Sequence, residues 1–110
     1  MATQQETIDF ILEHLPADGT IRARKMFGEY AIYCNEKVVA LVCDDQLFIK
    51  MNAVSLKLID KENAAPPYPG AKDHLIVPED KWGNAEWMTT LFLATEKLVA
   101  LPKKRKVTLK

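Results

Sequence analysis

The chain has 110 residues, 48% of them hydrophobic and 27% charged, which predicts one globular domain. No window reaches the roughly 18 uncharged apolar residues of a membrane-spanning helix, and the first residues lack the pattern of a signal peptide, so we expect a soluble cytoplasmic protein. The net charge is zero, but residues 102–110 hold five of the 15 basic residues and no acid. Residues 1–101 therefore have a net charge of −5. An acidic domain is a poor partner for nucleic-acid phosphates.

The first predicted element is an amphipathic helix near the N-terminus. Thr3-Gln4-Gln5-Glu6 has the spacing of a capping box, in which Thr3 would accept a hydrogen bond from the first turn. Apolar residues then recur along one helical face at Ile8, Ile11, Leu12 and Leu15. Pro16 and Gly19 predict the end of this helix.

Three strands separated by short polar turns are predicted next, over residues 29–34, 38–43 and 46–51, with a shorter strand at 20–24 before them. The middle run, VVALVC, is apolar on both faces, which predicts a central strand covered on each side. Hairpin-length links favour an antiparallel meander.

The second half of the chain mixes helical and irregular signals. Residues 52–60 fit either a short helix capped by Asn52 or a further strand. NAAPPYPGAKDH at 63–74 predicts an irregular loop packed on the domain through Tyr68, followed by a strand at 74–78. Asn84 predicts the cap of a final helix that Pro102 ends. The fold class is therefore α+β, with helices at both ends of a single domain over residues 1–101.

Catalytic and metal-binding patterns are lacking in the sequence. Cys34 and Cys43 lie near the ends of neighbouring predicted strands, too far apart for a disulfide, so we expect two buried, reduced thiols. His14 and His74 belong to no hydrolase, zinc or phosphate-loop motif. We expect no enzyme activity, no metal and no cofactor.

Arg22, Arg24 and Lys25 are the candidate partner-binding cations, and the alternation of an extended segment places Lys25 on the opposite face from the two arginines. Two interpretations remain open. The three cations contact a partner or a phosphate group, or they are only solvated while Met26, Phe27 and Gly28 shape the entry into the sheet; we favour the second.

Two further segments carry candidate binding residues. Tyr68 and Lys72 of the proline-rich loop, together with the three cations, form the predicted protein-binding surface. A cleft between the sheet and this loop, with Tyr68 and Trp82 as walls, would instead bind a small molecule. The basic tail, with Lys103, Lys104, Arg105 and Lys106, is a candidate nucleic-acid arm or a solubilising end.

The order of these segments resembles a known family. RKMFGEYAIY at 24–33, VVALV at 38–42, LFIK at 47–50 and APPYPGAK at 65–72 resemble the N-terminal domain of the TfoX/Sxy family. The resemblance covers residues 4–102 and implies a curved antiparallel sheet with flanking helices. It also implies a regulatory or protein-interaction role linked to bacterial competence, with no assigned catalytic residue.

The resulting prediction is a non-enzymatic regulatory or protein-interaction domain, monomeric or homodimeric, with an unidentified protein partner. The alternative is a nucleic-acid-binding accessory protein that uses its basic tail.

Overall fold

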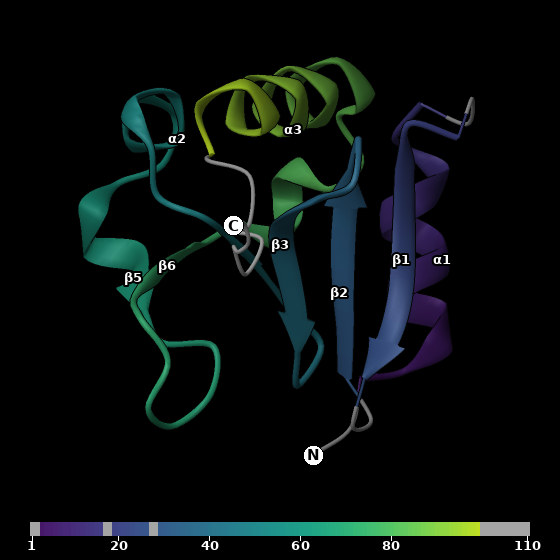
Figure 1. Ribbon diagram of the computed structural model, residues 1–110, viewed down its shortest axis with the longest axis horizontal. Helices are drawn as coiled ribbons and strands as arrows, with labels where there is room; N and C mark the ends of the chain where they lie inside the picture. The colour runs from purple at the N-terminus through teal and green to yellow at the C-terminus, as the bar shows by residue number, and fades with distance from the viewer. Residues whose placement is uncertain (1–2, 17–18, 27–28, 100–110) are drawn as a thin grey trace, which may run out of the picture.

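An antiparallel sheet with helices at both ends of the chain forms the protein, as the computed structural model shows for residues 3–16, 19–26 and 29–99 (Figure 1). The helices are α1 (Gln5–Glu13), α2 (Ala53–Leu58) and α3 (Ala85–Leu98), and 3-10 turns occupy Lys61–Asn63 and Glu79–Lys81. The strands are β1 (Ile21–Met26), β2 (Glu29–Cys34), β3 (Lys37–Cys43), β4 (Gln46–Ile49), β5 (Ala64–Ala65) and β6 (His74–Ile76). The α+β fold class is confirmed.

The strands follow the order β1-β2-β3-β4-β6-β5, and every neighbouring pair is antiparallel. The predicted three-strand meander is confirmed as β2, β3 and β4, with the shorter predicted strand before it as β1, and β3 lies between β2 and β4. Two-residue turns join β2 to β3 and β3 to β4. Asn35, Glu36, Asp44 and Asp45 all have positive φ there, from 52° to 71°, which is the backbone that tight hairpins require.

The two faces of the sheet have different covers. Helices α1 and α3 pack on one face, which we call the inner face, and α1 lies behind β1 in Figure 1. Its core includes Ile11 from α1, Phe92 from α3 and Ile32 from β2, all fully buried. The other, outer face carries the proline-rich loop. None of the described helices has the length and apolar character needed to cross a membrane.

The first helix is confirmed, but its predicted capping box is wrong. Gln4 is the N-cap residue and makes no side-chain cap. The Thr3 hydroxyl instead donates to the Glu29 carboxylate at 2.5 Å, because β2 brings that acceptor beside it. Asp45, in the turn between β3 and β4, accepts hydrogen bonds from the Gln4 amide and the Thr7 hydroxyl, both at 2.8 Å. A distant hairpin therefore performs the capping that a local pattern predicted.

The two alternatives for residues 52–60 are resolved in favour of a helix. Asn52 caps α2 by accepting from the amides of Val54 and Ser55, each at 2.9 Å. Ser55 is fully buried, and its hydroxyl accepts from the Asn52 amide at 2.9 Å, which completes a capping box. The side-chain nitrogen Nδ2 of Asn52 also donates to the Thr95 hydroxyl of α3 at 2.9 Å, and so connects the two helices.

The proline-rich segment is irregular except at its start. Ala64 and Ala65 form β5 against β6, although residues 63–74 were predicted to contain no regular structure. The prolines begin only at position 66, so both alanines keep the amides that a strand needs. The loop was predicted to pack on the domain through Tyr68, and the structure buries Pro67 while it leaves Tyr68 55% exposed.

Candidate binding surface

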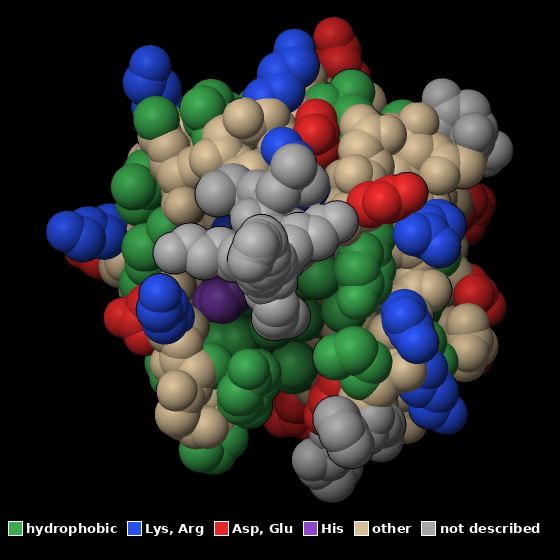
Figure 2. Space-filling model, viewed as in Figure 1, with side chains coloured by type: hydrophobic (Ala, Val, Ile, Leu, Met, Phe, Trp, Pro, Cys, Tyr) green, Lys and Arg blue, Asp and Glu red, His purple; other side chains and the backbone are tan. Residues whose placement is uncertain are grey.

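Two arginines lie on the outer face of β1. Ile21 and Ala23 contact the core on the inner face, so Arg22, Arg24 and Met26 project outward by alternation. The Arg22 guanidinium lies 5.8 Å from the centre of the Tyr33 ring on β2, directly across the register. In the view of Figure 2, Lys and Arg side chains gather over the side of the molecule where β1 lies, beside hydrophobic surface. The structure therefore gives β1 a basic outer face.

The third candidate cation does not join the two arginines. Lys25 is exposed, but it follows the inner-face alternation and projects away from Arg22 and Arg24, as the sequence alternation predicted. Of the three candidate cations of β1, Arg22 and Arg24 therefore share the outer face.

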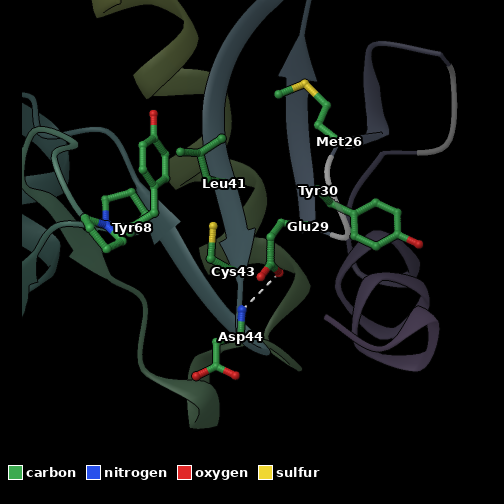
Figure 3. Close-up of a pocket in the computed structure, with 9 residues that line it drawn as sticks. Met26, Glu29, Tyr30, Leu41, Cys43, Asp44 and Tyr68 are labelled. Atoms are coloured by element: carbon green, nitrogen blue, oxygen red, sulfur yellow. Dashed lines mark hydrogen bonds between the residues drawn. The ribbon is translucent and has the colours of Figure 1, made fainter. Parts of the chain in front are cut away.

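A hollow of about 580 Å³ lies between the sheet and the proline-rich loop (Figure 3). Its apolar walls come from Met26 at the end of β1, Leu41 and Cys43 on β3, and Tyr68 with its flanking prolines. Met26 is 40% exposed although it is a large apolar side chain, because it forms one rim of this hollow. An open, mainly apolar hollow of this size is the usual form of a binding site.

One end of the hollow is acidic. Glu29 and Asp44 both line it. Glu29 is held in place, because one of its carboxylate oxygens accepts from the Thr3 hydroxyl and from the Asp44 amide at 3.1 Å (Figure 3). The Cys43 thiol beside them has a pKa raised to about 11, first by burial and then by the negative charges of Glu29 and Asp44. This thiol is therefore protonated and unreactive at neutral pH.

The structure brings some of the predicted loop residues to this surface and separates others. Tyr68 forms a wall of the hollow, across from Met26. Lys72 is exposed and lies near Lys50, whose pKa is lowered by burial first and by the charge of Lys72 second. Lys72 therefore belongs to a separate basic spot beside β4 and β6.

The predicted small-molecule cleft is only partly correct. A cleft between the sheet and the loop exists, with Tyr68 as one wall. Trp82 is not the other wall, because it is 5% exposed, belongs to the core cluster and donates through its indole nitrogen to the Val77 carbonyl at 3.2 Å. Leu41 and Met26 take that place. Sequence reasoning missed Leu41, since its apolar character indicated only a buried strand.

Several candidates lie outside the described residues. These are Phe27 and Gly28 of the strand-entry motif, and Lys103, Lys104, Arg105 and Lys106 of the tail.

Both histidines bond to the backbone, with Nδ1 of His14 2.9 Å from the Phe10 carbonyl and Nδ1 of His74 2.9 Å from the Lys72 carbonyl. Cys34 and Cys43 are both buried, and neither forms a disulfide within the described residues. Within residues 3–16, 19–26 and 29–99, no group of three or more histidine, cysteine, aspartate or glutamate side chains is placed to hold a metal ion.

Comparison with known proteins finds similarity to a protein family and to a bacterial protein. A family model, the TfoX N-terminal domain, matches residues 12–97. An uncharacterized 12.7 kDa protein from the trpE 5' region of Spirochaeta aurantia is 32% identical over 106 residues, which cover 96% of this chain and 91% of that protein.

Proposed function

This chain belongs to the TfoX N-terminal domain family, and from that premise we propose that it is a non-enzymatic regulatory module that binds a protein partner in the cytoplasm. Competence-type transcriptional regulation is the setting that this family suggests. The observation that carries the proposal is the open apolar hollow between β1, β3 and the proline-rich loop, next to the exposed Arg22 and Arg24.

The exposed side chains of this surface are of the kind that dominates protein interfaces. Met26 and Tyr68 keep 40% and 55% of their surface in solvent and face the same hollow. Aromatic residues, methionine and arginine are enriched in interfaces, and a few such anchors carry most of the binding energy. A partner that covers Tyr68 and Met26 while pairing with Arg24 would bury apolar surface now exposed to water.

Affinity capture with two variants tests this proposal. Tyr68→Ala removes the exposed wall of the hollow, and Arg24→Glu reverses a charge beside it. We expect each to reduce recovery of the same partner at least severalfold, since hot-spot truncations cost about 2 kcal/mol or more.

Lys61→Glu is the matched control, because it makes the same charge change at an exposed position in the 3-10 turn before β5. Equal recovery of every partner by the wild type and by all three variants would show that this surface is not the binding site.

The alternative is nucleic-acid binding, and the uneven charge distribution favours it. Residues 102–110 carry +5 against −5 in the remainder of the chain, so any affinity for phosphates would come from Lys103 to Lys106. Four or five phosphate contacts predict a log–log salt slope of roughly −4 on duplex DNA. A salt series with the full chain and with a chain ending at Leu101 tests this. A steep salt dependence that is lost on truncation would support DNA binding by the tail. A flat salt dependence with the full chain would exclude it.

A further inference from the structure

The outer face of the sheet changes charge along β1. Arg22 and Arg24 lie at its beginning and middle, and Met26 lies at its end. Glu29 is the register partner of Met26, and Asp44 follows the last residue of β3 at the same end of the strands. The face therefore carries cations along the first part of β1, and acidic side chains lie beside Met26 at its other end.

The length of this gradient matches a short extended peptide. Arg22 and Met26 are four residues apart on one strand, so their Cα atoms are separated by roughly 13 Å. An extended peptide places residues i, i+2 and i+4 on one side over the same length. The hollow lies at the acidic end of this span, bounded by Met26, Leu41 and Tyr68.

We propose that this face binds an extended segment of the protein partner that presents an acidic, an apolar and a basic side chain at alternate positions. The acidic side chain pairs with Arg22 or Arg24, the apolar one enters the hollow, and the basic one meets Glu29 and Asp44. This inference rests on the proposed function and specifies the chemistry of the partner.

Charge complementarity selects this occupant. The Glu29 carboxylate is fixed by its bonds to Thr3 and to the Asp44 amide, so little side-chain freedom is lost when it meets a cation. A segment with acids at both ends would face Glu29 and Asp44 with like charge, and one with bases at both ends would face the arginines. Either mismatch weakens binding.

A set of serine heptapeptides tests the selectivity with the full-length protein. Each carries leucine at its centre and a charged residue two positions to either side. In the first set, one charged position is glutamate and the other is lysine, in both orders. In the second set both charged positions are glutamate, and in the third both are lysine. Affinity is measured by fluorescence anisotropy at low salt.

We expect the mixed-charge peptides to bind about two- to fivefold more tightly than either like-charged set, the range of one exposed ion pair. Replacing the central leucine by serine should weaken all of them, and so should Tyr68→Ala.

A charge-reversal variant provides the decisive comparison. Arg22→Glu combined with Arg24→Glu makes both ends of the proposed peptide site acidic, so the preference should move to the peptides with two lysines. Lys25→Glu is the control, because this lysine lies on the opposite face of β1 and should leave the preference for mixed charge unchanged. A thermal melt confirms that each variant is folded.

Equal binding of the three peptide sets, or an unchanged preference in the charge-reversed variant, would overturn the inference. The proposed function fails separately, when the capture experiment shows no dependence on Tyr68 or Arg24. A partner lost on Tyr68→Ala, together with no charge preference among the peptides, would therefore reject the inference alone.

Discussion

Replacing Asn52 by alanine should destabilise the protein more than the loss of an ordinary helix cap. The Asn52 side chain accepts from two amides of α2, and its Nδ2 donates to Thr95 on α3 at 2.9 Å and to the Lys50 carbonyl at 3.1 Å. Thr95 is fully buried, so water cannot replace the lost partner. The Asn52 side chain thus makes hydrogen bonds to both helices, to two amides of α2 and to the Thr95 hydroxyl of α3.

The expected cost has two parts. Loss of a helix N-cap costs about 1 kcal/mol. A buried hydroxyl left without its partner costs roughly 1–3 kcal/mol more. Asn52→Ala should therefore lower the free energy of unfolding by about 2–4 kcal/mol, a large share of the roughly 5–15 kcal/mol of a typical domain.

Urea denaturation of a double-mutant cycle separates these parts. Thr95→Val removes the hydroxyl at nearly constant shape, and Asn52→Ala is then measured with and without it. The bond between Asn52 and Thr95 predicts a coupling free energy of about 1 kcal/mol. A coupling within about 0.3 kcal/mol of zero would refute the connection between the two helices, whatever the single variants show.

Four further predictions concern the turns and the thiol. Glu36 has φ of 71°, so Glu36→Gly should raise the free energy of unfolding by about 1 kcal/mol in urea, and an unchanged midpoint would contradict this. Asp45→Gly should instead lower the melting temperature, because Asp45 accepts hydrogen bonds from the Gln4 amide and the Thr7 hydroxyl. A stabilisation by Asp45→Gly equal to that of Glu36→Gly would disprove this role. These two bonds, the Gln4 amide first, lower the pKa of Asp45 below its usual 3.8. Its contribution to stability is therefore complete above that value and lost as the pH falls through the lowered pKa, so Asp45→Asn should flatten the acid side of a melting-temperature profile. The Cys43 thiol, with a pKa of about 11, should react slowly with iodoacetamide at pH 7.5 and quickly in urea, as followed by mass spectrometry; fast alkylation of the native protein would contradict its burial.

Local patterns were sufficient for the parts of the fold that local interactions determine. The apolar run at 38–43 predicted a central strand, and Asn84 predicted the start of α3, because alternation and capping act within a few residues. The same reasoning failed at Thr3. Its capping pattern was present, but the Glu29 carboxylate, 26 residues away, took the hydroxyl.

The candidate surface was predictable only in its exposed charges. Alternation alone separates Arg22 and Arg24 from Lys25, and the structure agrees. The hollow depends on how the proline-rich loop crosses the sheet, which brings Tyr68 opposite Met26 from more than 40 residues away in the sequence. No spacing within the sequence encodes that meeting.

The two outermost strands also determine how copies of this protein behave at high concentration. A sheet edge is a template on which another chain can add a strand and begin a fibril. β1 ends the sheet on one side with two arginines and a lysine, so a second β1 would meet three like charges. β5 ends it on the other side with only two alanines, and the prolines that follow offer no amide hydrogens. Both edges therefore disfavour the addition of a strand from a second molecule.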